Sequence, residues 1–227
     1  MRFNGFRISP ITLCWLRYLF VKPRMLRYYK LWRNSLRVKI SAPNDQLPWM
    51  VYEAIDWLES FLSVEMQVFE WGSGGSTIFF SKRVQSVVTI EHDTKWYSAV
   101  NRQLRLSNTR NVRLVLCNPE ESTTREGAYA STDEAYKGLS FRRYVEAIEI
   151  YPDGFFDLVV VDGRARASCL SHAWVKIRPG GYLLLDNSDR SEYQRAKEPL
   201  SDWEEQKFYG PGPYNYYSWQ TTVWEKT

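Results

Sequence analysis

The stretch FEWGSGGSTIFF, residues 69–80, places three glycines and three small hydroxyl residues between two apolar runs. This pattern predicts a strand that ends at Trp71 and a helix that begins near Ser76. Glycine lets the backbone pass close to a ligand, and the start of a helix offers free N–H groups. The stretch therefore predicts a ligand-binding loop, although a tight structural turn explains its glycines equally well. It is not a phosphate loop, because no GK[ST] follows it.

Outward from this loop, short apolar runs alternate with helical stretches. Strands are predicted at Gln67–Trp71, Ser86–Glu91, Val112–Cys117, Asp157–Val161 and Tyr182–Leu185. Helices are predicted from Pro48 onward and around 76–83, 94–107, 139–150, 166–177 and 190–201. This alternation indicates an α/β fold, with a doubly wound and mainly parallel sheet covered by helices on both faces.

The C-terminal stretch EEQKFYGPGPYNYYSWQTTVWEKT, residues 204–227, breaks the alternation. It contains two strand-like runs around a loop rich in glycine and proline, which predicts an antiparallel hairpin at the sheet edge. We expect the aromatic part of this loop to cover the pocket that holds a substrate.

Polar residues follow the predicted strands at the carboxyl edge of the sheet, where ligands bind in such folds. Glu91 lies 19 residues beyond Gly72, a spacing that suits a carboxylate binding both hydroxyls of a ribose. His92 is expected to pack next to the adenosine, and Asp93 to cap the following helix. Asn118 follows the third strand and is expected either to hydrogen-bond an adenine or to form a turn.

Two further strands end in acids. Asp162 and Gly163 follow FFDLVVV, and Asp186 and Asn187 follow GGYLLL. A carboxylate has no packing role at a strand end, so its repeated occurrence there indicates a binding site.

The segments FEWGSGGST, TIEHD, FDLVVVDG and RPGGYLLLDN, in this order and spacing, resemble the class I S-adenosylmethionine-dependent methyltransferases over residues 50–227. The resemblance implies a seven-stranded sheet whose last strand is antiparallel. It also implies that Glu91 binds the ribose, that His92, Asn118 and Asp162 lie along the cofactor, and that a loop holds its methionine end. The loop residues are Glu70, Gly72, Ser73, Gly74, Gly75, Ser76 and Thr77.

The implied reaction is methyl transfer to a nucleophile, for which the protein mainly supplies orientation. We predict O-methylation of a small-molecule or glycan-type acceptor, with Asp162, Arg164 and Asp186 as catalytic residues. Asp162, Asp186 and Asn187 also resemble the Mg²⁺ ligands of cation-dependent O-methyltransferases. The lysine of that pattern is Ala165 here, however, and the arginines nearby oppose a cation and could hold a carboxylate or phosphate of the substrate instead. These arginines are Arg164, Arg166 and Arg190.

Two other functions are compatible with parts of the pattern. A glycine loop followed by an acid also suits an NAD-dependent oxidoreductase, but Thr77 stands where the third glycine of GxGxxG is expected. A non-catalytic module on the same fold, binding a membrane or a partner, is the other alternative, because fold alone does not establish activity.

The chain divides into a basic helical arm with a linker, residues 1–47, and the α/β domain, residues 48–227. Residues 1–40 carry ten lysines and arginines and no acid, whereas the other 187 residues carry 20 basic and 26 acidic groups, a net charge of −6. An amphipathic basic helix of this kind is expected first to pack on the domain or across a homodimer. It also suits an anionic membrane surface, with peripheral contact through residues 11–39 as the second prediction. Nucleic-acid binding is the least favoured alternative.

Cys14, Cys117 and Cys169 form no CxxC pair, which favours a reducing, cytoplasmic setting over a disulfide framework or a zinc site. The apolar run Ile11–Val21 is interrupted by Arg17 and is shorter than a membrane span. No A-x-A-like cleavage site follows it, so we expect no secretory signal.

Overall fold

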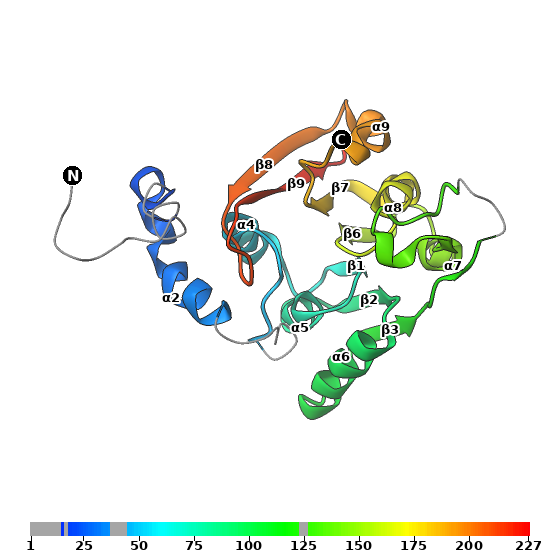
Figure 1. Ribbon diagram of the computed structural model, residues 1–227, viewed down its shortest axis with the longest axis horizontal. Coiled ribbons are helices and arrows are strands. Elements are labelled where there is room, and N and C mark those ends of the chain that lie inside the picture. The colour runs from blue at the N-terminus through cyan, green and yellow to red at the C-terminus, as the bar shows by residue number, and fades with distance from the viewer. Residues whose placement is uncertain (1–14, 16–17, 37–44, 123–126) are drawn as a thin grey trace.

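The computed structural model describes residue 15 and residues 18–36, 45–122 and 127–227. Seven strands form one sheet in the order β3-β2-β1-β6-β7-β9-β8 (Figure 1). The strands are β1 (Gln67–Trp71), β2 (Ser86–Glu91), β3 (Val112–Leu116), β6 (Phe156–Val161), β7 (Ile177–Asp186), β8 (Glu204–Gly210) and β9 (Trp219–Glu225). The first five pair in parallel, and β9 is antiparallel to β7 and β8. The predicted α/β sheet and its terminal hairpin are confirmed.

Helices cover both faces of this sheet (Figure 1). Successive strand residues point to opposite faces, so each parallel strand contributes to two cores. Val68 of β1 packs in one core with α4 and α5, whereas Phe69 and Trp71 pack in the other core with α7 and α8. The helices are α4 (Tyr52–Phe61), α5 (Gly75–Ser81), α6 (Thr94–Leu106), α7 (Arg142–Val145), α8 (Arg166–Ala173) and α9 (Gln194–Lys197). The doubly wound arrangement follows from this double burial.

Several predicted boundaries differ from the structure. The helix predicted from Pro48 begins at Tyr52, because Val51 is extended (ψ 142°) and the Tyr52 N–H donates to Pro211 O at 3.0 Å. Strand β7 begins at Ile177, five residues before the predicted start, and includes the Pro-Gly-Gly segment beside a register shift against β6. Tertiary pairing with neighbouring strands overrides the local turn signal there.

Three predicted helices are short or interrupted. The segment 139–150 forms the two-residue strand β5 (Leu139–Ser140), which pairs with β4 (Glu120–Glu121), and then α7 and the 3-10 turn η3 (Glu146–Ile148). Helix α8 ends at Ala173 and continues as η4 (Trp174–Lys176). The segment 190–201 consists of η5 (Ser191–Tyr193), α9 and η6 (Glu198–Leu200), where Pro199 removes an amide donor.

The described part of the arm is helical and packs on the domain. It contains η1 (Pro23–Met25) and α2 (Leu26–Ser35). Tyr28 and Trp32 are 7% and 3% exposed; the Tyr28 ring stacks on Tyr52 of α4 with centroids 4.3 Å apart, and the Trp32 indole donates to Asn215 O at 2.9 Å. The apolar face of α2 is thus covered by α4 and the β8–β9 loop.

The outer side of the arm stays exposed, with Phe20 91% exposed and Leu26 and Leu31 also accessible. Residues 11–14, 16–17 and 37–39 of the predicted membrane contact, and residues 42–44 of the linker, lie outside the described residues. Within the described ranges, no helix is long and apolar enough to cross a membrane.

Candidate active site

The glycine loop lies where the strand order reverses, between β1 and β6. Gly72 has φ +93°, a conformation that favours glycine, and its amide donates to Ile90 O at 2.9 Å. A Cβ on Gly72 would lie 2.8 Å from Gly163 Cα, so the loops after β1 and β6 touch backbone to backbone. In open α/β sheets this reversal is the position at which ligands bind.

Glu70 stabilises the glycine loop from the side that faces away from the pocket. Its carboxylate accepts hydrogen bonds from the hydroxyls of Ser76 and Thr77 in the first turn of α5, the latter at 2.6 Å. The Thr77 hydroxyl also accepts the Gly74 N–H at 3.0 Å. Glu70 is fully buried, and burial raises its pKa to about 7. Glu70 and Thr77 are thus placed behind the loop and do not line the pocket, whereas Gly72, Ser73, Gly74, Gly75 and Ser76 do.

Glu91 joins the loops that follow β1 and β2. Its Oε2 accepts the Ser73 N–H at 2.9 Å and the Ser73 hydroxyl at 2.8 Å. Its Oε1 accepts the N–H groups of His92 and Asp93, both at 2.8 Å. The carboxylate is therefore fixed at the pocket wall by four donors. The Glu91 carboxylate thus lies at the end of β2, the position at which the sequence predicts a residue that binds ribose.

The side chains around Glu91 have mainly positioning contacts. His92 lines the pocket, and its Nε2 lies 2.9 Å from the Tyr136 hydroxyl. Asp93 caps α6 as predicted, because its Oδ1 accepts the Trp96 N–H at 2.8 Å. The Asn118 amide donates to His92 O at 2.9 Å, and Asn118 does not line the pocket. Asn118 thus connects the end of β3 to the loop after β2.

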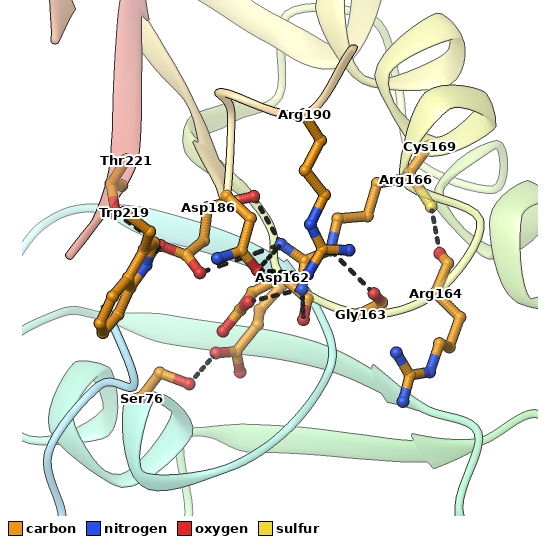
Figure 2. A network of polar contacts seen from close by, with 12 residues as sticks. Ser76, Asp162, Gly163, Arg164, Arg166, Cys169, Asp186, Arg190, Trp219 and Thr221 are labelled. Atoms are coloured by element: carbon orange, nitrogen blue, oxygen red, sulfur yellow. Dashed lines mark hydrogen bonds and ion pairs between the residues drawn. The ribbon is translucent and has the colours of Figure 1, made fainter. Parts of the chain in front are cut away.

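The predicted metal ligands converge on a guanidinium group (Figure 2). Arg166 Nη2 lies 3.1 Å from Asp162 Oδ1, and Arg166 Nη1 lies 3.9 Å from Asp186 Oδ2. Nη1 also donates to the Asp186 carbonyl at 2.5 Å and to Asn187 Oδ1 at 3.3 Å. The positive charge at the predicted metal position is therefore the guanidinium group of Arg166.

This geometry corrects the Mg²⁺ prediction for Asp162, Asp186 and Asn187. The Arg166 side chain, only 9% exposed, fills the space between the ligands, so a second cation there would meet its positive charge. Within the described ranges, no group of three or more acidic, histidine or cysteine residues is arranged to hold a metal. The residues present do not fit a magnesium ion.

Asp186 is fixed from the hairpin side. Its Oδ1 accepts the Trp219 indole N–H at 2.9 Å and the Thr221 hydroxyl at 2.5 Å, both from β9. Burial raises the pKa of Asp186 and raises that of Asp162 well above its usual range, and the Arg166 charge opposes both shifts. The predicted catalytic residue Arg164 pairs with Asp133 Oδ2 at 3.0 Å and also lines the pocket.

One cavity of about 390 Å³ connects these groups, a size typical of small-ligand sites. The glycine loop, Glu91 and Asp93 line the side predicted for the cofactor, and Asp162, Asp186 and Arg190 line the side predicted for the acceptor. The same opening therefore brings together residues of four strand ends.

No protein-family model matches the sequence, and a search of curated proteins gave no significant match. Solved structures do match. A Streptococcus mutans protein described as a methyltransferase, in complex with SAH, has a TM-score of 0.53 at 12% identity, covering 82% of this chain and 99% of that chain. An rRNA methylase from Streptococcus thermophilus has a TM-score of 0.53 at 12% identity, covering 84% of this chain and 100% of that chain.

A precorrin-6y C5,15-methyltransferase from Geobacter metallireducens also has a TM-score of 0.53, at 14% identity, covering 77% of this chain and 87% of that chain. The fold is that of the class I methyltransferases.

Several residues of this methyltransferase-fold pocket are absent from the sequence predictions. The Trp96 indole donates to Ser73 O and lies beside Gly74, while Trp49 and Tyr136 line other walls. The Trp96 position could have been inferred, because it lies in the first turn of the helix after Glu91. Trp49 carries no such signal, since it precedes α4 and reaches the site only through folding.

Proposed function

We propose that this chain is a methyltransferase that uses S-adenosylmethionine and methylates an oxygen of a small-molecule or glycan-type acceptor. The observation that supports this most directly is the single cavity joining the glycine loop and Glu91 to the carboxyl group of Asp162. One end offers backbone and a carboxylate for a nucleoside, and the other offers a proton acceptor for a hydroxyl.

The cofactor side is suited to S-adenosylmethionine. Gly72 and Gly74 leave the loop without side chains, so a ligand can approach the backbone closely. The Glu91 carboxylate is held at the wall at the end of β2, and it would accept from a ribose hydroxyl once the Ser73 hydroxyl rotates away from it. Glu70 acts as a positioning residue, because it fixes the loop through Ser76 and Thr77.

The bound cofactor would supply an electrophilic methyl group. This methyl group would pass to the acceptor oxygen as the S–C bond breaks, with the electron pair of that bond left on the sulfur. Asp162 takes the hydroxyl proton in this proposal, and Arg166 at 3.1 Å stabilises the charged form that can accept it. Asp186 holds the guanidinium from the other side, so Arg166 and Asp186 are positioning residues for Asp162.

Calorimetric titration with S-adenosylhomocysteine, with NAD as a parallel titration, tests the cofactor assignment. We expect saturable one-to-one binding of S-adenosylhomocysteine and no binding of NAD. The double variant Gly74→Arg, Glu91→Ala should lose this binding while circular dichroism shows a folded domain. Binding of NAD alone would instead support the oxidoreductase alternative, and unchanged affinity in the variant would refute the site.

A further inference from the structure

Three arginines line the pocket, and they differ in what balances their charge. Arg166 lies between the carboxylates of Asp162 and Asp186, and Arg164 pairs with Asp133 at 3.0 Å. Arg190 is exposed and lies at the acceptor side of the same cavity. It is therefore the arginine whose charge is free to meet a ligand.

Arg190 has only neutral partners within the described part of the chain. Its Nη2 donates to Asn187 Oδ1 at 3.2 Å, and its Nη1 donates to the Tyr193 hydroxyl at 3.4 Å. No carboxylate there lies within ion-pairing distance of it. The long contacts to Asn187 and Tyr193 hold the guanidinium in place and leave other N–H groups for a ligand.

A shared amide oxygen brings two positive charges together. Asn187 Oδ1 accepts from Arg190 at 3.2 Å and from Arg166 at 3.3 Å, so the two guanidinium groups share one acceptor atom. Two carboxylates face Arg166, whereas no carboxylate of the described residues pairs with Arg190. An oxyanion bound at Arg190 could form two parallel hydrogen bonds with its guanidinium group.

The walls near this charge suit a ring that carries hydroxyl groups. Trp49, Tyr217 and Trp219 line the cavity together with Asn215, which adds polar groups. Aromatic faces of this kind pack against rings through apolar contact while leaving polar edges free for hydrogen bonds. The acceptor side thus combines aromatic side chains, a guanidinium group that no carboxylate of the described residues pairs with, and a proton acceptor.

We propose that the acceptor is an anionic hydroxy compound whose carboxylate or phosphate is bound by Arg190, so that one of its hydroxyls reaches Asp162. This inference rests on the proposed methyltransferase function and names the substrate class of the same site. Arg190 is then a specificity-determining residue that contacts the acceptor, whereas the glycine loop contacts the cofactor.

Methyl transfer from labelled S-adenosylmethionine to matched acceptor pairs tests the proposal. The pairs are D-glucuronate with D-glucose, D-glucose 6-phosphate with D-glucose, and 3,4-dihydroxybenzoate with catechol. In at least one pair we expect kcat/KM for the anionic member to be about tenfold or more higher, as for a charge-assisted hydrogen bond. The pair that responds shows whether the group is a carboxylate or a phosphate.

Arg190→Gln should abolish this preference by raising KM with kcat nearly unchanged, and its affinity for S-adenosylhomocysteine should equal that of the wild type. Arg195→Gln is the matched control, because Arg195 is exposed and lies outside the cavity. Equal use of neutral and anionic members, or no use of any anionic member by protein that binds S-adenosylhomocysteine, would overturn the inference.

A loss of S-adenosylhomocysteine affinity in Arg190→Gln would also overturn it, since Arg190 would then bind the cofactor. Failure of the wild type to bind S-adenosylhomocysteine is measured separately, before any acceptor is added. That result would refute the proposed function itself, and the acceptor class with it.

Discussion

The two sides of the cavity are built in different ways. The cofactor side comes from two short continuous segments, 72–76 and 91–93, which the hydrogen bonds that Glu91 accepts from Ser73, His92 and Asp93 hold together, with further bonds donated by Trp96 and Asn118. The acceptor side comes from the ends of β6 and β7, the β8–β9 hairpin and Trp49, and long-range contacts to Asp186 hold it. A site formed by short local segments can be predicted from the sequence. A site formed by segments that lie far apart in the chain depends on the complete fold.

The largest effect is expected on the acceptor side, from Arg166→Met. The change leaves the buried Asp186 and the partly buried Asp162 without their cation, which should lower the free energy of unfolding by about 3–5 kcal/mol. Urea unfolding at pH 8 measures the loss. Because the unpaired carboxyls take up protons in the folded state, the loss should be smaller at pH 6. Arg195→Met, an exposed control, should change little, and a comparable loss there would show that the ion pair with Asp162 and Asp186 is not the cause.

The next largest effect separates two glycines of the cofactor side. Gly72→Ala combines a positive φ with a 2.8 Å contact to Gly163 and should cost about 3 kcal/mol of stability. Gly74 is extended, and a Cβ there would lie 3.5 Å from the Trp96 indole, so Gly74→Ala should cost less than about 1 kcal/mol. Thermal unfolding of the two variants measures the difference. Equal costs would show that the backbone contact between the two loops does not limit the fold.

Glu70 gives the cofactor side a pH dependence of its own. Its pKa is raised to about 7 in the folded protein, so the folded state binds more protons than the unfolded state between the ordinary value and 7. Its contribution to stability is therefore full below pH 4.5 and is lost as the pH rises through 7, by up to about 3 kcal/mol. Glu70→Gln should flatten the fall in unfolding free energy between pH 5 and pH 8, measured by urea titration. If the unfolding free energy of Glu70→Gln falls as much as that of the wild type, groups other than Glu70 cause the pH dependence.

For added Mg²⁺ or EDTA we expect no effect. Since Arg166 occupies the position between Asp162, Asp186 and Asn187, added Mg²⁺ or EDTA should leave methyl transfer and S-adenosylhomocysteine affinity unchanged. Activity assays with each additive check this, and dependence on Mg²⁺ would show that the guanidinium leaves the site during the reaction.

Much of the fold could be predicted from local patterns. Strands β1 and β2 have the predicted bounds, and Asp93 caps α6 as expected, because hydrophobic alternation and capping act over a few residues. The start of β7 could not be predicted, since pairing with β6 extends the strand through a Pro-Gly-Gly segment. The arm shows the same limit: its amphipathic pattern predicts a helix, and only the fold shows α4 and the β8–β9 loop covering its apolar face.

The sequence by itself determined the class of fold and the glycine loop and Glu91 as neighbours at one side of the pocket, because glycines, hydroxyls and carboxylates act there on their neighbours along the chain. Only the tertiary structure decided that Glu70 lies behind the loop, that Arg166 fills the position predicted for a metal, and that Arg190 lacks a carboxylate partner in the described chain. The physical reason is that burial and charge pairing depend on which distant side chains meet, and spacing along the chain does not specify those meetings.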